Sequence, residues 1–297
     1  MELIIVGNCR LKNEIMNVYD NGLKYLNELL NKINIQSLRK IVVTDYSFDN
    51  YQKSVREISK HLCNHINLAN DGDVGAATVI SGINETGEFE QIVFYRGDIF
   101  LSYCEYFLDE SYFTGLKSMD DRNYLIHSSE IAFECIIHEI GHVIERNFIY
   151  KKYNYFQLDK QYNLVNELDE YIISVMLIIW SEYYAQRFMY SLVDNYQLPN
   201  NEEIIESVEN CEDRGFSNNL DTVKKILYWF VLYISYYHKV NEAIPIFNDL
   251  RLAKVCLALM KVSSLFSTLY YTFTIWDFDE VKAKLKNIYI ELYITLF

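Results

Sequence analysis

The chain is almost free of the residues that interrupt helices. Its 297 residues include only 2 prolines and 10 glycines. Proline removes a helix hydrogen bond, and glycine costs about 1 kcal/mol against alanine in a helix interior. Helices in such a chain can continue over many turns, so we expect a mainly helical protein. Beyond residue 98 the apolar spacing predicts helices only, at residues 99–115, 128–148, 158–195, 202–210, 219–240, 245–272 and 277–296.

The first hundred residues show a different pattern, with short β-branched and apolar runs. These runs predict strands at residues 3–6, 40–44, 77–83 and 89–95, with helices at 11–32 and 49–64. Residues 84–87 have the composition of a turn, so the last two strands should form a β-hairpin. We therefore expect an α+β fold that is mainly α, with a small N-terminal mixed sheet and a large C-terminal helical region. The predicted lobes are residues 1–125, which contain the hairpin, and 126–297, which are helical.

Acidic residues outnumber basic ones. The chain has 41 Asp and Glu against 27 Lys and Arg, which gives a formal net charge of −14. Binding to the phosphates of nucleic acid needs clustered lysines and arginines, and the sequence contains no such basic run. We therefore expect no nucleic-acid partner.

The cysteines and the apolar segments indicate the cellular compartment in which we expect the protein. Six cysteines lie far apart without a CxxC pair, which favours reduced, mostly buried thiols over a disulfide framework. The apolar segments at residues 171–180 and 226–237 are too short for a clean membrane span. The opening residues have a strand pattern and not that of a signal peptide. These features favour a cytoplasmic protein with no membrane partner.

One segment carries a pattern that metalloenzymes use. It reads His138-Glu139-Ile140-Gly141-His142. Two histidines four residues apart lie on one face of a helix, one turn from each other, and their ring nitrogens can reach one metal ion at about 2.0–2.1 Å. Glu139 is offset by one position, so it can reach a water on the same ion. The spacing predicts two metal ligands, His138 and His142, and a catalytic base, Glu139.

The residues around this motif are apolar. Two histidines and a glutamate in such a helix are costly to bury unless a ligand or a hydrogen bond satisfies them, and this favours a metal site. The alternative is a buried structural turn whose polar groups are satisfied by the protein itself. The apolar flanks are Ile136, Ile137, Ile140, Val143 and Ile144.

A catalytic zinc ion usually has three protein ligands and one open position, so a third ligand must come from another helix. Glu182 is an isolated carboxylate in the otherwise apolar segment 172–185, and such a group needs a partner. Glu167, on a more polar stretch, is the second candidate. In the alternative interpretation Glu182 pairs with Arg187 or with a tyrosine hydroxyl and binds no metal.

The HEIGH segment followed some 40 residues later by Ser181-Glu182-Tyr183-Tyr184 resembles the gluzincin pattern of the zincin metallopeptidases. In layout the chain is similar to the bacterial ImmA/IrrE-type metallopeptidases, which place a small sheet before the HExxH helix. The resemblance implies a zincin-like active-site helix, Zn²⁺ held by His138, His142 and Glu182, and Glu139 as general base. One position differs, since Gln186 stands where thermolysin-like members carry an aspartate.

The expected function is therefore hydrolysis of peptide bonds by a zinc-activated water. A hydroxyl or imidazole should help to stabilise the oxyanion. Tyr184 is our candidate, beside Tyr183, His127 and His238, although each of these can instead have a structural role. The expected partner is a peptide or protein substrate, cut by a narrow-specificity regulatory protease. The alternative is a non-catalytic regulatory or binding protein on a zincin scaffold.

Overall fold

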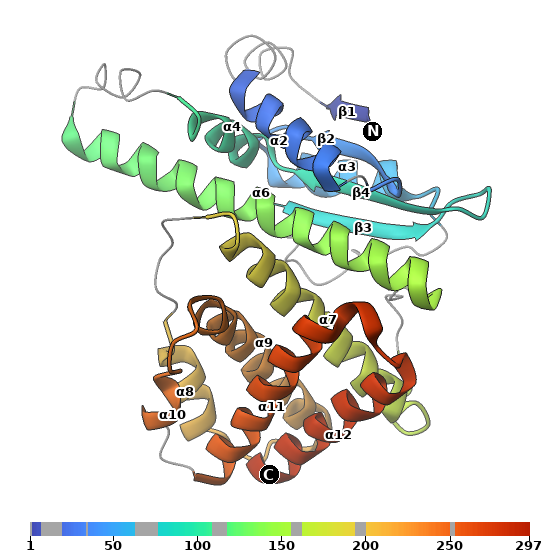
Figure 1. Cartoon of the computed structure of the whole chain (residues 1–297), viewed down its shortest axis with the longest axis vertical. Coiled ribbons are helices and arrows are strands. Elements are labelled where there is room, and N and C mark those ends of the chain that lie inside the picture. The colour runs from blue at the N-terminus through green and yellow to red at the C-terminus, as the bar shows by residue number, and fades with distance from the viewer. Residues whose placement is uncertain are drawn as a thin grey trace. The chain divides into compact units, whose positions relative to one another are not determined.

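The computed structural model describes residues 2–6, 20–33, 35–62, 77–108, 118–155, 162–193, 200–249 and 253–297. By its internal contacts the chain divides into two compact units, Met1–Asp159 and Lys160–Phe297. The first unit combines a small sheet with helices, and the described part of the second is helical (Figure 1). The predicted mainly helical α+β class with a small N-terminal mixed sheet is confirmed.

The sheet of the first unit has four strands in the order β1-β2-β4-β3. β1 (Glu2–Ile5), β2 (Leu38–Val43) and β4 (Phe89–Tyr95) are parallel, and β3 (Ala77–Ile83) runs antiparallel to β4. β3 and β4 have the predicted bounds, and they form the predicted hairpin. β4 is buried along its whole length, as expected for a strand with neighbours on both sides and helices on both faces.

The hairpin turn is held by one asparagine. The Asn84 side-chain oxygen accepts the backbone N–H groups of Thr86 at 3.0 Å and of Glu88 at 2.9 Å. Gly87 has φ +82°, a left-handed conformation that glycine adopts without steric cost. This local chemistry explains why the sequence alone located the turn.

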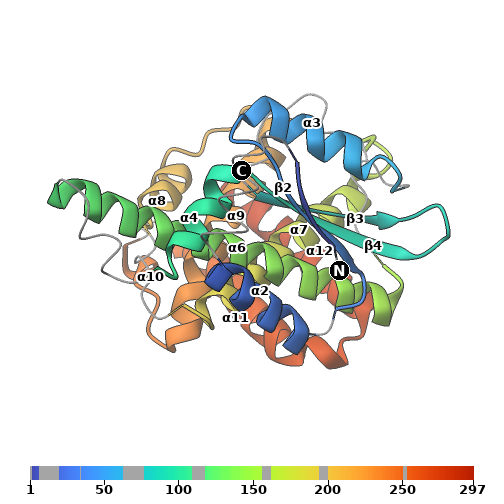
Figure 2. The same cartoon turned by 90° about the horizontal axis from the view of Figure 1, so that it is seen from above.

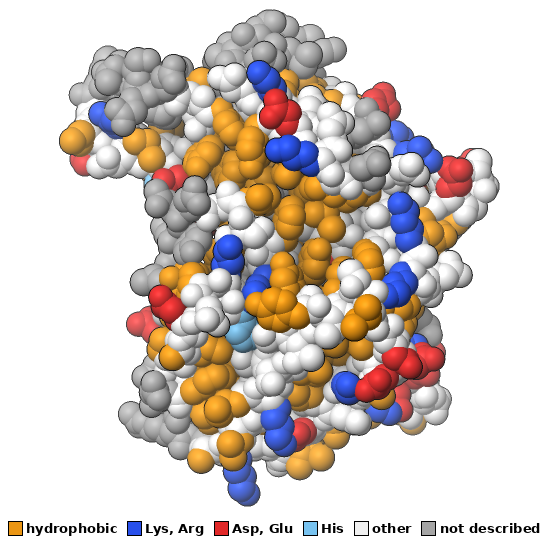
Figure 3. Space-filling view, in the orientation of Figure 1, with side chains coloured by type: hydrophobic (Ala, Val, Ile, Leu, Met, Phe, Trp, Pro, Cys, Tyr) orange, Lys and Arg blue, Asp and Glu red, His pale blue; other side chains and the backbone are white. Residues whose placement is uncertain are grey.

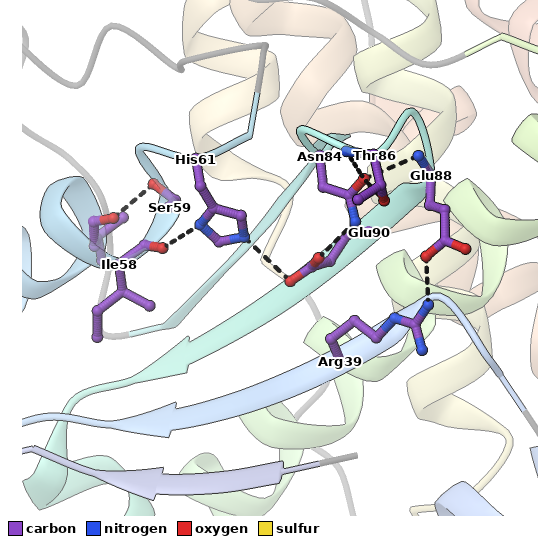
Figure 4. Close-up of polar contacts among 9 residues, drawn as sticks. Arg39, Ile58, Ser59, His61, Asn84, Thr86, Glu88 and Glu90 are labelled. Atoms are coloured by element: carbon purple, nitrogen blue, oxygen red, sulfur yellow. Dashed lines mark hydrogen bonds and ion pairs between the residues drawn. The ribbon is translucent and has the colours of Figure 1, made fainter.

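A polar cluster ties this turn to α3 (Phe48–Ser59) (Figure 4). Glu90 is buried and accepts from the Asn84 amide at 3.3 Å, and its other carboxylate oxygen lies 3.3 Å from His61 Nε2. The exposed pair of Arg39 and Glu88 joins β2 to the same turn at 2.9 Å. The cluster therefore connects the end of α3, the hairpin and β2.

Helices cover both faces of the sheet (Figure 2). α3 packs on one face, where Tyr51 and Val55 join a core with Ile92 and Phe94 of β4. α2 (Asp20–Ile33) and the long helix α6 (Met119–Tyr153) lie on the other face, and α4 (Gly97–Glu105) packs on both of them. The predicted helices at residues 11–32, 49–64 and 99–115 each extend into segments outside the described residues.

α6 is longer than the predicted segment 128–148. It begins at Ser118, whose side chain accepts the N–H of Asp121 at 3.0 Å, and it ends at Asn154 in a left-handed conformation. Both are common helix caps. α6 belongs to the first unit and starts before residue 126, and the predicted lobe boundary after residue 125 stays a prediction.

Buried polar side chains fix α6 against the sheet. Gln91 of β4 is fully buried, and its Nε2 donates to the Val143 carbonyl of α6 and to Ser37 Oγ, both at 3.0 Å. Ser37 Oγ donates in turn to Asn147 on the next turn of α6, at 2.7 Å. These bonds satisfy polar groups that water cannot reach, so they define one position of the helix along the strand.

Two further contacts act in the same way at other points of α6. The Tyr95 hydroxyl donates to the Ile136 carbonyl at 3.2 Å. Arg146 donates to the Val79 carbonyl of β3 at 2.7 Å. α6 is therefore joined to β4 on both sides of the segment that carries the histidines, and also to β3.

The described elements of the second unit are all helical. α7 packs against α9 and α12, and α11 packs against α12. The predicted helix at 245–272 is divided into α10 and α11, with residues 250–252 outside the described part. The bounds are α7 (Leu168–Tyr190), α8 (Glu202–Glu209), α9 (Phe216–Val240), α10 (Ile246–Asp249), α11 (Ala253–Thr272), the short 3-10 helix η1 (Phe273–Ile275) and α12 (Phe278–Leu296).

One described stretch, Ala253–Ile275, is long and apolar enough to cross a membrane, and 39% of its apolar window is buried in the protein. A single helix of this kind is weak evidence for a span, because core helices of soluble proteins have the same length and composition. Apolar side chains are visible on the surface in Figure 3, interspersed with charged ones.

Replacing Gln91 by leucine should lower the free energy of unfolding by about 2–3 kcal/mol, because Ser37 and the Val143 carbonyl lose a buried partner. Urea unfolding followed by circular dichroism measures this change. Arg39→Ala is the control, since it removes an exposed ion pair on the same sheet and should cost at most about 1 kcal/mol. Equal losses in the two variants would contradict the anchoring role of Gln91.

Candidate metal centre

The two motif histidines converge on one point in the middle of α6. Their Nε2 atoms lie 3.0 Å apart, with ring centroids 4.7 Å apart and ring planes at 83°. One carboxylate oxygen of Glu139 joins them, and the three ligand atoms lie within 4.8 Å of one another. The spacing of four residues on a helix thus gives the convergence that the sequence predicted. His142 is buried, and His138 and Glu139 are half-buried.

This donor set fits a divalent transition metal. Two imidazoles bound at about 2.0–2.1 Å to a tetrahedral zinc ion have their nitrogens about 3.3 Å apart, close to the 3.0 Å between these two. Neutral imidazole is a preferred ligand of zinc, and also of copper, iron and nickel. The chemistry therefore fits a metal ion, and zinc is one member of the class.

The negative charge of Glu139 reaches several buried groups. Burial is the largest cause that raises the pKa of Tyr51 and of Tyr95 above their usual range, and the charge of Glu139 is the second largest. The same two causes, in the same order, raise the pKa of Cys135 to about 11. The thiol next to the motif is therefore neutral near pH 7.

Tyr51 is unusual among these groups. Its side chain is fully buried, and its hydroxyl has no hydrogen-bond partner. It lies in the first turn of α3, where its N–H donates to Ser47, just after the end of β2. The opposite charges of Glu139 and Arg96 both act on it. A buried donor without an acceptor costs about 1–3 kcal/mol, so a group of this kind next to a candidate metal site is a candidate for contact with a ligand.

Tyr95 and Arg96 lie in the same part of the first unit, at the end of the sheet. Both lie at the carboxyl end of β4, and the Thr44 N–H at the end of β2 donates to the Tyr95 carbonyl at 2.9 Å. Arg96 forms a bidentate pair with Asp98, at 2.6 and 2.7 Å. Ligand sites in open α/β sheets lie at the carboxyl ends of parallel strands. Tyr51, Tyr95 and Arg96 were not among the predicted site residues, although their positions at or after the ends of two predicted strands were an available signal.

The remaining predicted site residues lie in the second unit. Glu182 is half-buried on α7. Glu167 precedes α7, where its carboxylate accepts the Asn163 N–H at 3.0 Å. Tyr184 packs against the rings of Tyr270 and Phe273, with centroids 5.6 and 5.1 Å apart. The roles of Glu182, Glu167 and Tyr184 at a metal ion stay predictions.

The other candidate groups have identified contacts. Arg187 donates to the hydroxyls of Tyr183 and Tyr271 rather than to Glu182. The Tyr183 hydroxyl lies 2.6 Å from His238 Nδ1. His127 is exposed on α6, outside the group of convergent ligands.

Comparison with known proteins found no matching family model, no matching curated protein and no matching solved structure. The resemblance to zincins therefore rests on the sequence pattern and stays a prediction.

Tyr51→Phe should raise the free energy of unfolding of the metal-free protein by about 1 kcal/mol, because it removes a buried hydroxyl that has no acceptor. Tyr95→Phe is the matched control: this hydroxyl is equally buried but donates to a carbonyl, so its loss should destabilise by about 1 kcal/mol. Urea unfolding of both variants measures the two signs. A loss of stability in both variants would mean that the Tyr51 hydroxyl has a partner.

Proposed function

We propose that the chain is a zinc-dependent metallopeptidase of the zincin type. The observation that carries this proposal is the convergence of two imidazole nitrogens, 3.0 Å apart, with the Glu139 carboxylate in the same group. A structural metal site needs ligands but no base. A carboxylate beside two histidine ligands, on a helix fixed to a sheet, is the arrangement that hydrolysis requires.

His138 and His142 would hold the ion, and a zinc ion in this place supplies an acidified water and a positive charge for the substrate carbonyl. Glu139 takes a proton from the attacking water and delivers it to the leaving amine.

Glu182 is the proposed third ligand and Tyr184 the proposed oxyanion donor, both from α7. Glu182 stands among apolar residues in the sequence, whereas the Glu167 carboxylate accepts a backbone N–H, and this difference favours Glu182 over Glu167. A hydroxyl that shares the oxyanion charge is a common part of peptide hydrolysis.

The substrate we propose is an extended peptide. β3 is an edge strand of the described sheet and lies beside α6, as the bond from Arg146 to Val79 shows. The part of this strand edge beyond the Val79 carbonyl can bind a peptide through backbone hydrogen bonds, which selects an extended conformation rather than one sequence. We propose that the protein acts as a narrow-specificity regulatory protease in the cytoplasm. The alternative function is non-catalytic binding on the same scaffold.

Purified protein should contain about one zinc ion per chain by elemental analysis, and His138→Ala should lose it, since a site with fewer ligands binds metal much more weakly. His127→Ala is the matched control, because it removes an exposed histidine from the same helix. Full retention of zinc by His138→Ala would contradict the site, as would a wild-type protein that takes up no metal when zinc is offered.

The same measurement separates the two candidates for the third ligand. Glu182→Ala should lower the zinc affinity of the protein by about tenfold or more, because it removes a metal ligand. Glu167→Ala should leave the affinity unchanged, because its carboxylate caps a turn. The reverse pattern would assign the ligand to Glu167.

Glu139→Gln should retain zinc but lose roughly 10²–10⁴-fold in hydrolysis, the usual contribution of a general base. Labelled casein and a mixed peptide library, followed by mass spectrometry, are suitable probes. Glu130→Gln, nine residues earlier on α6, is the control and should remain active. Zinc-loaded wild-type protein that cleaves no member of the library would favour the non-catalytic alternative.

A further inference from the structure

The second unit contains a buried cation. Arg187, near the end of α7, is 5% exposed. Its guanidinium donates to Tyr183 Oη at 3.5 Å and to Tyr271 Oη at 3.1 Å, and it lies 4.6 Å from the centroid of the Tyr270 ring. Tyrosine rings and hydroxyls attract a cation, but none of them carries a compensating negative charge.

No acidic residue neutralises this guanidinium in the described part of the chain. The ion pairs there, within 4.0 Å, all involve other residues. Among the described residues, Arg187 is also the only charged side chain that shifts the pKa values of the neighbouring groups His238, Tyr183 and Tyr270. Arginine is almost never fully buried unless it is paired, because the loss of hydration costs several kcal/mol per ion. An anion from solution would offset this cost.

A chain of hydrogen bonds holds the inner side of the guanidinium. His238 Nε2 lies 2.8 Å from Ser263 Oγ, and Nδ1 lies 2.6 Å from Tyr183 Oη. Burial, followed by the charge of Arg187, lowers the pKa of His238 to about 4, so the ring is neutral near pH 7. A neutral ring can accept the Tyr183 O–H, which leaves the Tyr183 oxygen to accept from Arg187. Tyr183 is thus occupied and cannot donate to a ligand.

The outer side is different. Tyr271 is 72% exposed, and its oxygen accepts from Arg187. Its own O–H donates to no protein group among the described residues. The Arg187 guanidinium and the Tyr271 O–H are therefore neighbouring donors, and the exposed Tyr271 ring is the side on which the cluster meets solvent.

The charge of the cluster selects the kind of anion. One guanidinium balances one negative charge, whereas a phosphate group carries about −1.5 to −2 at pH 7. A carboxylate is a monoanion, and its two oxygens fit the planar fork of a guanidinium. The single cation therefore favours a carboxylate over a phosphate.

We propose that Arg187 and Tyr271 form a binding site for a carboxylate group, which receives hydrogen bonds from the guanidinium and from the phenol O–H, with the Tyr270 ring packed against the guanidinium. The site lies within the second unit and uses no metal ligand. It therefore does not depend on the proposed hydrolytic function.

Thermal unfolding of the full chain in sodium acetate, against sodium chloride at equal ionic strength, tests the site. Tryptophan fluorescence is the readout, because Trp180, Trp229 and Trp276 all belong to the second unit. Acetate should raise the wild-type midpoint by a few degrees beyond chloride, since a ligand that binds only the native state stabilises it. Arg187→Met should abolish this gain.

Two further variants sharpen the test. Tyr271→Phe removes one donor from an exposed ring and should weaken acetate binding roughly tenfold, and it keeps the test available if Arg187→Met does not fold. Arg214→Met is the matched control. That side chain is 68% exposed and pairs with Glu212 at 3.5 Å, so its loss should leave the acetate gain unchanged.

Three results would overturn the proposal. An equal midpoint in acetate and chloride for the wild-type protein overturns the site, as does an acetate gain that survives in Arg187→Met. A larger gain in phosphate than in acetate overturns the choice of a carboxylate.

A separate experiment identifies the kind of molecule that supplies the carboxylate. Trialanine with a free carboxyl terminus is compared with its amide in the same assay. Tighter binding of the free tripeptide than of acetate, with no binding of the amide, supports the site and identifies a peptide C-terminus. Equal binding of acetate and the free tripeptide also supports the site and identifies small organic acids.

Discussion

The position of α6 along the sheet is the constraint on which the candidate metal centre depends. Two carbonyl groups of α6, at Ile136 and Val143, accept hydrogen bonds from Tyr95 and Gln91 of β4. They lie on either side of the metal motif. A helix displaced by one residue turns by about 100°, which would direct the imidazoles elsewhere. Both donors are fully buried, so such a displacement would leave them without acceptors, and the free-energy cost opposes it.

The sequence predicted the parts of this fold that depend on local chemistry. The strands of the hairpin have the predicted bounds, because β-branched and apolar runs on either side of a turn with Asn84 and Gly87 are short-range signals. The convergence of His138 and His142 follows from helix geometry alone. The length of α6 was underestimated, since its polar first turns look like a loop until the Ser118 cap is identified.

Other parts of the two sites depend on tertiary contacts and were not predictable in the same way. Tyr51 comes near Glu139 only because α3 starts beside the carboxyl ends of the parallel strands. An ion pair between Arg187 and Glu182 was one interpretation of the sequence. Five residues on a helix turn about 140°, and only separations of three or four place side chains next to each other. Arg187 therefore faces the tyrosines of α11 rather than Glu182.

The bond from Arg146 to the Val79 carbonyl has a consequence for the solubility of the protein. β3 is an edge strand of the described sheet, and unpaired backbone groups on such an edge can recruit strands from other molecules and start aggregation. Here a charged side chain from α6 occupies one carbonyl near the start of β3. A second copy of the strand cannot extend a regular ladder past this point without displacing a guanidinium. The contact that fixes the helix thus also acts as a gatekeeper against fibril-like growth.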